Sequence, residues 1–96
     1  MLRLNVSPDA ERDVDDIFLF GAQKYGVSAS DAYLDGLQEA FVFLEHHPRI
    51  ARERRNIRPP VRLYRYVAHN ILYAIDGEDV LILRVLHHSA NWIDHL

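Results

Sequence analysis

The chain of 96 residues contains no cysteine. This absence excludes a disulfide scaffold, a thiol nucleophile and a thiolate zinc site together. No apolar run approaches the ~20 residues that a membrane-spanning helix needs, and no charged segment precedes an apolar one at the start, as in a secretory signal. We therefore expect a cytoplasmic protein. The hydrophobic share of 49% and the charged share of 26% are ordinary for a globular chain, so disorder is not expected.

The net charge of −3 hides an uneven distribution. Residues 1–48 hold nine acids and three bases, a net of −6, so the rest of the chain carries +3. Between Arg49 and Tyr66 there are seven arginines and a single acid, Glu53, which gives this basic segment a local net of +6. Such a segment predicts an acidic partner, either protein or nucleic acid. A solvated arginine-rich loop would have the same composition.

Apolar residues recur with a period of 3.6 in two stretches, which predicts two helices joined by a short connection. The first spans about 8–25, with Ser7 as its N-cap and Gly26 closing it. The second begins at Ser28 as N-cap and ends before Pro48, which cannot continue a helix. The buried faces that these spacings predict are Ala10, Val14, Ile17, Phe18, Gly21 and Tyr25 in the first helix and Tyr33, Leu37, Ala40, Phe41 and Leu44 in the second.

Short runs that alternate apolar and polar residues, or are rich in β-branched residues, predict strands before and after the helices. One run covers residues 2–6, and three more cover 61–67, 71–75 and 80–86. The resulting order, β-α-α-β-β-β, predicts one α+β domain over residues 1–96. In it a helical hairpin packs on one face of a small antiparallel sheet and buries both apolar helix faces.

Four stretches of the chain follow, in order, the patterns of one known family. They are Leu4–Val14 with Ile17, which runs from a strand into a Ser-Pro-x-Ala helix cap; Phe41-x-x-Leu44-x-x-His47-Pro48; the hairpin residues Arg62, Tyr66, His69, Ile71 and Tyr73; and Ile82–His87. Together they resemble the RelE/ParE toxin superfamily. The last stretch, which ends in Arg-Val-Leu-His, resembles its ParE branch.

This resemblance implies the toxin component of a bacterial type II toxin–antitoxin module, a class that includes plasmid-stabilisation proteins. RelE-like members are ribosome-dependent ribonucleases, whereas ParE-like members are described as poisons of DNA gyrase without a catalytic site. Both are neutralised by an antitoxin encoded beside them. The ParD-type antitoxin couples a ribbon-helix-helix DNA-binding region to a tail that wraps the toxin, so contact with DNA would be indirect. No cofactor is implied.

The expected partner sites follow from the charge pattern and from the C-terminal tail of this chain, residues 88–96. Antitoxin tails are commonly acidic and amphipathic, which fits the basic segment, the helix faces and the sheet edge. The candidate antitoxin-binding residues are Arg49, Arg52, Arg54, Arg55, Arg58, Arg62 and Arg65. Trp92, the single tryptophan, either covers the sheet, which we favour, or contacts the target. The candidate target-binding residues are Asn91, Trp92 and His95.

The alternative function is cleavage of mRNA on the ribosome. Cutting RNA through its 2′-hydroxyl needs a base, an acid and cations around the phosphate. Glu53 as base, Arg65 and Arg84 as phosphate clamps and His87 as acid are the candidates. A net charge of −3 and a pI of about 6.0 disfavour a protein that must bind among phosphates. We therefore predict a toxin that acts by protein binding, and a structural role for Arg84 as the partner of a helix carboxylate or of the tail.

Two histidine pairs, His46-His47 and His87-His88, resemble metal ligands in their composition. Adjacent residues on a strand point to opposite faces, and neighbours on a helix are turned about 100° apart. Neither pair is expected to chelate one ion, so we predict no metal site.

Overall fold

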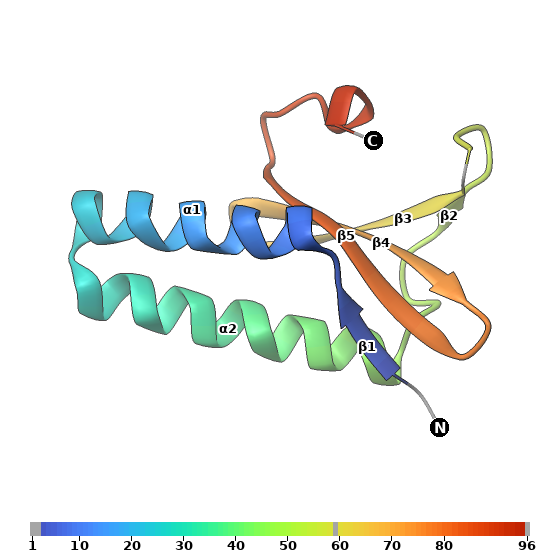
Figure 1. Ribbon diagram of the computed structural model, residues 1–96, viewed down its shortest axis with the longest axis horizontal. Coiled ribbons are helices and arrows are strands. Elements are labelled where there is room, and N and C mark those ends of the chain that lie inside the picture. Colours follow the sequence, from blue (N-terminus) through green and yellow to red (C-terminus); the bar gives the residue numbers. More distant parts are fainter. Residues whose placement is uncertain (1–2, 59, 96) are drawn as a thin grey trace.

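Two antiparallel helices lie across one face of a five-stranded sheet in the computed structural model, which describes residues 3–58 and 60–95 (Figure 1). This arrangement confirms the predicted α+β class and helical hairpin. The elements are β1 (Arg3–Val6), α1 (Pro8–Tyr25), α2 (Val27–His46), β2 (Glu53–Arg54), β3 (Val61–Tyr66), β4 (His69–Asp76), β5 (Asp79–His87) and a final 3₁₀ turn, η1 (Trp92–His95). The short strand β2, within the basic segment, was not predicted.

The strands lie in the order β1-β5-β4-β3-β2. β2, β3, β4 and β5 pair antiparallel, but β1 pairs parallel with β5. The sheet is therefore mixed, whereas the sequence predicts an antiparallel sheet. The chain between β1 and β5, which forms the helical hairpin and then β2, β3 and β4, is the long connection that a parallel pair needs. Strand periodicity in the sequence carries no information on which strand becomes the neighbour of β1.

The start of α1 is fixed to β5 through Ser7. Its hydroxyl accepts a hydrogen bond from the backbone N–H of Ala10 at 3.0 Å and donates one to the carbonyl oxygen of Leu83 at 2.7 Å. The predicted N-cap is therefore confirmed. The predicted N-cap at Ser28 is wrong, because α2 begins at Val27. Gly26, at φ 97°, turns the chain in a single residue and belongs to both helix ends.

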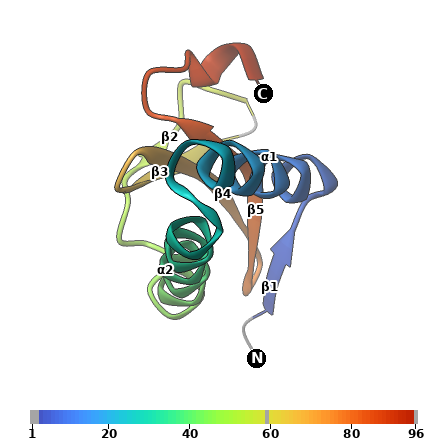
Figure 2. The same cartoon turned by 90° about the vertical axis from the view of Figure 1, so that its left-hand side faces the viewer.

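The core lies between the hairpin and the sheet. Leu37, Phe41 and Leu44 of α2 are buried as predicted, against Ile71 and Ile82 of the sheet. The prediction for Tyr25 is wrong, since its side chain is 67% exposed. In the view from the connecting end of the hairpin, α1 and α2 lie next to each other in front of the strands (Figure 2). None of the helices among the described residues is long and apolar enough to cross a membrane.

Candidate partner-binding site

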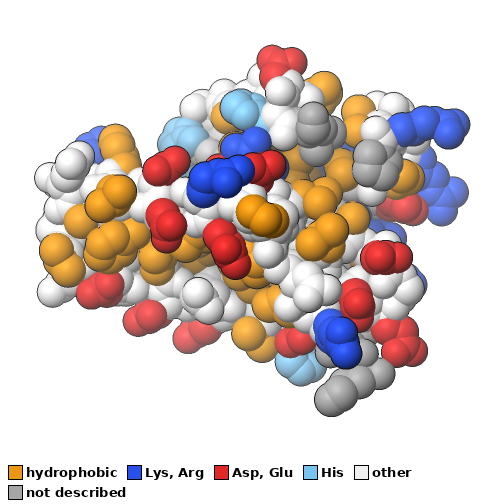
Figure 3. All heavy atoms as spheres, viewed as in Figure 1, with side chains coloured by type: hydrophobic (Ala, Val, Ile, Leu, Met, Phe, Trp, Pro, Cys, Tyr) orange, Lys and Arg blue, Asp and Glu red, His pale blue; other side chains and the backbone are white. Residues whose placement is uncertain are grey.

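A groove of about 790 Å³ opens where the hairpin meets the ends of β3, β4 and β5. The connecting end of the hairpin extends past the sheet in Figure 1, and hydrophobic side chains gather on it in Figure 3. The apolar part of the lining includes Ile17, Phe20, Tyr33, Val67, Val85 and Leu86. Such a concave, mostly apolar surface is typical of a binding site.

The rim of the groove on α1 carries large side chains that the fold leaves in solvent. Phe20 is 63% exposed, and Leu19 and Val27 are also exposed nearby along the hairpin. The ammonium of Lys24 lies 5.5 Å from the ring centre of Phe20 and 5.4 Å from that of Tyr25. This exposed surface is the kind of apolar patch that marks a protein interaction site.

Tyr33 of α2 is the centre of the hydrogen bonds in the groove. Its hydroxyl lies 2.7 Å from Nδ1 of His69 and accepts a hydrogen bond from the backbone N–H of Ala68 at 3.2 Å. Its own carbonyl oxygen accepts a hydrogen bond from the hydroxyl of Tyr66 at 3.0 Å. Gly36 makes this approach possible, since a Cβ there would lie 2.0 Å from the Tyr66 hydroxyl oxygen. These contacts attach α2 to the β3–β4 turn.

Burial sets the charge state of this cluster. It raises the pKa of Tyr33 and of Tyr66 above the ordinary value for tyrosine. Burial also lowers the pKa of His69, with a further contribution from His87 and His88. These shifts favour the neutral forms near pH 7, which keeps this wall of the groove uncharged.

Three histidines stand together at this end of the sheet. The ring centres of His69 and His87 are 5.7 Å apart, and those of His87 and His88 are 4.4 Å apart. The prediction that His87 and His88 point to opposite faces is therefore wrong, because β5 ends at His87 and the chain turns there. Within residues 3–58 and 60–95, no group of three or more histidine and carboxylate side chains is placed to hold a metal ion.

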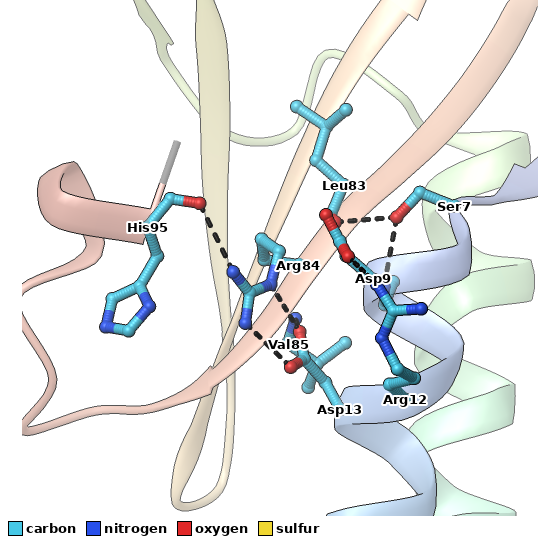
Figure 4. A network of polar contacts seen from close by, with 9 residues as sticks. Ser7, Asp9, Arg12, Asp13, Leu83, Arg84, Val85 and His95 are labelled. Atoms are coloured by element: carbon cyan, nitrogen blue, oxygen red, sulfur yellow. Dashed lines mark hydrogen bonds and ion pairs between the residues drawn. The ribbon is translucent and has the colours of Figure 1, made fainter.

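Arg84 is held by α1. Nε and Nη2 of its guanidinium donate to the carboxylate of Asp13 at 2.8 and 2.9 Å, and Nη1 donates to the carbonyl oxygen of His95 at 3.3 Å (Figure 4). Hydrogen bonding to Asp13 raises the pKa of Arg84 above its ordinary value. The guanidinium therefore joins α1, β5 and η1, which supports the structural role predicted for it.

The arginines of the basic segment divide into two groups. Arg49, Arg52, Arg55, Arg58 and Arg65 are exposed, whereas Arg54 and Arg62 are partly buried. Nη1 of Arg62 donates to the carbonyl oxygen of Ala51 at 2.6 Å, which fixes the connector against β3. The guanidinium of Arg54 lies 5.6 Å from the ring centre of Trp92. Within the exposed group, Nε of Arg55 donates to the carboxylate of Glu53 at 3.2 Å, whereas Arg49, Arg52 and Arg58 offer exposed charge to a partner.

The tail candidates have different environments. Trp92 is half-buried against Arg54 of β2, a contact that supports the covering role we favour. Asn91 and His95 are exposed. Nδ2 of Asn91 donates to the carboxylate of Asp94 at 3.1 Å, within the η1 region.

The four candidate ribonuclease residues are not all brought together. Glu53 lies opposite Arg62 on β3, with its carboxylate 3.9 Å from that guanidinium. His87 lies opposite His69, at the other end of the sheet from that pair. Arg84 is held by Asp13, and Nε of Arg65 donates to the carbonyl oxygen of Val67 at 2.7 Å. Arg65 and His87 lie at one end of the sheet and Glu53 at the other, so the proposed base is apart from the proposed acid.

The groove and the Tyr33 cluster were not found in the sequence. The helical spacing predicts a core position for Tyr33, and the family pattern marks His69 without giving it a role. The hydrophobic repeat of α1 continues to Tyr25, past the edge of the sheet. An apolar helix face that is longer than the sheet beneath it leaves apolar side chains such as Tyr25 exposed, and this length is the feature of the sequence that indicates the groove.

Residues 4–92 match the family model of the ParE toxin of the type II toxin–antitoxin system, parDE. Toxin ParE3 of Caulobacter vibrioides is 34% identical over 79 residues, which cover 82% of this chain and 79% of the relative. Toxin ParE1 of the same organism is 33% identical over 91 residues, covering 95% and 94%. Toxin ParE1 of Mycobacterium tuberculosis is 33% identical over 90 residues, covering 93% and 92%.

A solved structure described as the chromosomal ParDE TA system from P. aeruginosa has the same fold. Its TM-score is 0.79 at 19% identity, with 91% of this chain and 96% of that chain covered. The fold and the family model thus define a toxin of a type II toxin–antitoxin system. The chain belongs to the ParE toxin family.

Proposed function

We propose that this toxin is neutralised by a ParD-like antitoxin of the ribbon-helix-helix type, whose acidic, amphipathic tail docks on the groove and the basic segment. The observation that carries the proposal is the open apolar groove in a member of the ParE family. Exposed apolar side chains at the groove end of the hairpin, such as Phe20, would be covered by the tail, and the exposed arginines would meet its acids. DNA would be reached only through the antitoxin.

The free toxin, in this proposal, inhibits DNA gyrase by binding it and has no chemistry of its own. The dispersed positions of Glu53, His87 and Arg84 support a non-catalytic mode of action. The exposed tail residues Asn91 and His95 remain the proposed contacts with the target, and Trp92 would join them only if it does not cover the sheet. Cleavage of mRNA is the alternative outcome, and a cytoplasmic location remains a prediction.

The antitoxin part is tested with the purified product of the reading frame beside this gene. Arg52→Ala/Arg58→Ala should weaken its binding about tenfold and flatten the salt dependence between about 50 and 500 mM, because screening acts on exposed charge pairs. Arg3→Ala/Arg12→Ala removes the same charge from the acidic half and should leave the affinity unchanged. Equal losses in both variants would point to net charge alone, and no binding by the wild type would contradict the proposal.

A further inference from the structure

The two-residue turn between β3 and β4 holds Val67 in a backbone conformation that valine rarely adopts. Its φ is 46°, and it is the only non-glycine residue with a positive φ in the part of the chain that the structure describes. Glycine is the usual first residue of a two-residue turn with positive φ at that position only. Branching at Cβ makes this region unfavourable for valine. Asparagine or glycine would therefore form the turn with less strain.

The surrounding structure holds the turn in place. The carbonyl oxygen of Val67 accepts a hydrogen bond from Nε of Arg65 at 2.7 Å. The N–H of Ala68 donates to the Tyr33 hydroxyl at 3.2 Å, and its carbonyl oxygen accepts from the N–H of His88 at 2.8 Å. Contacts from β3, α2 and the end of β5 thus maintain a conformation that the valine backbone would not choose alone.

The side chain of Val67 contributes little to the free protein. It is 65% exposed and lies on the lining of the groove. The free chain therefore carries both backbone strain and exposed apolar surface at one position, and neither stabilises the fold. Strained residues of this kind cluster at ligand-binding and switch positions.

We propose that Val67 is the anchor of the antitoxin interface, inserted into the apolar face of the tail that the groove receives. The identity of the partner rests on the proposed function. Two bases stand beside the apolar surface, Lys24 over Phe20 and Arg65 next to the turn, and would pair with acids beside the apolar face of the tail. The carboxylate of Asp13 on the lining is already paired with Arg84. Asp16 is the one exposed acid on the described lining.

Two substitutions separate strain from contact. Val67→Asn relieves the strain and removes the apolar side chain, so we expect the Tm to rise by about 4 °C while affinity for the purified product of the neighbouring reading frame falls about tenfold or more. Val67→Thr keeps the branched Cβ and adds a hydroxyl, so its Tm should stay within about 2 °C of the wild type with a similar loss of affinity. A higher Tm together with a lower affinity in Val67→Asn is the result that distinguishes this proposal.

Val42→Thr is the matched control, since Val42 of α2 is 48% exposed and does not line the groove. It should change neither affinity nor, beyond about 2 °C, the Tm. Wild-type affinity in Val67→Asn would overturn the anchor, and a lower Tm in that variant would overturn the strain. If the wild-type protein does not bind the antitoxin, the proposed function itself is contradicted. If the wild-type protein binds tightly and the Val67 variants bind equally well, only the role of Val67 is contradicted.

Discussion

The carboxylate of Asp13 on α1 accepts three hydrogen bonds from β5, two from the guanidinium of Arg84 and one from the backbone N–H of Val85 at 2.9 Å. A register shift beside Arg84 leaves Leu83 without a partner on β4. This irregularity lies directly before the two residues of β5, Arg84 and Val85, that Asp13 contacts. Asp13 therefore fastens the hairpin to the strand that borders the groove.

The Asp13–Arg84 pair should be strongly coupled in stability. The two side chains are 11% and 22% exposed, so removing one leaves the other charge poorly compensated. Asp13→Ala and Arg84→Ala should each lower the free energy of unfolding by about 2–4 kcal/mol. The double variant should lose less than the sum by about 1 kcal/mol or more, measured by urea unfolding. If the losses of the two single variants simply add, Asp13 and Arg84 do not stabilise each other, and the structural role of Arg84 is contradicted.

Gly36→Ala should destabilise the protein although alanine is the better helix former. The added Cβ would lie 2.0 Å from the Tyr66 hydroxyl oxygen, so Tyr66 must move and lose its bond to Tyr33. We expect a loss of about 1–3 kcal/mol in thermal or urea unfolding. Adding Tyr66→Phe removes the clashing oxygen and should recover part of the loss in Gly36→Ala. If the double variant is no more stable than Gly36→Ala, the clash with the Tyr66 hydroxyl is not the cause of the loss.

The stability of the toxin should fall below about pH 6.5 because of His69. Burial lowers the pKa of His69 in the folded protein, so the unfolded chain binds the proton more readily. The contribution of the neutral ring is complete above the unfolded pKa of about 6.5 and is lost as the pH falls from there toward the lowered folded pKa. His69→Asn should reduce the drop in Tm between about pH 7.5 and 5.5, a window in which carboxylates stay ionised.

The control for that experiment is His46→Asn, at the exposed last residue of α2. It should keep the wild-type dependence of Tm on pH. If His69→Asn also keeps it, His69 is not the group responsible.

Trp92→Ala should reveal how much the tail contributes to the fold. Trp92 packs against the guanidinium of Arg54, so we expect a loss of about 1–3 kcal/mol in urea unfolding. Trp92→Phe keeps an aromatic face and should lose less. A stable Trp92→Ala variant that no longer inhibits growth would instead assign Trp92 to the target interface.

The sequence predicts local structure well in this chain. Ser7 and Gly26 mark the limits of α1 because capping depends on neighbouring residues, and the strands β3 to β5 follow from their periodicity. The parallel pairing of β1 with β5 depends on contacts between residues more than seventy positions apart, such as Leu4 and Val80. Sequence periodicity has no access to such contacts.

The candidate site was harder to predict for the same reason. Exposed arginines such as Arg52 are found by composition, but the sequestration of Arg62 and Arg84 depends on their tertiary partners Ala51 and Asp13. The backbone of Val67 is set by the closing pair of the hairpin and by Tyr33 of α2, so its strain is invisible in the sequence.

We expect this ParE-family toxin to act by binding a protein target and not by cutting RNA. The most direct measurement adds the purified chain to gyrase and relaxed plasmid, and in parallel to a translating extract with labelled mRNA. We expect loss of supercoiling or trapping of cleaved DNA, reversal by the antitoxin, and intact mRNA. Unchanged supercoiling, together with codon-specific mRNA cuts that Arg65→Ala or His87→Ala abolishes, would contradict the account.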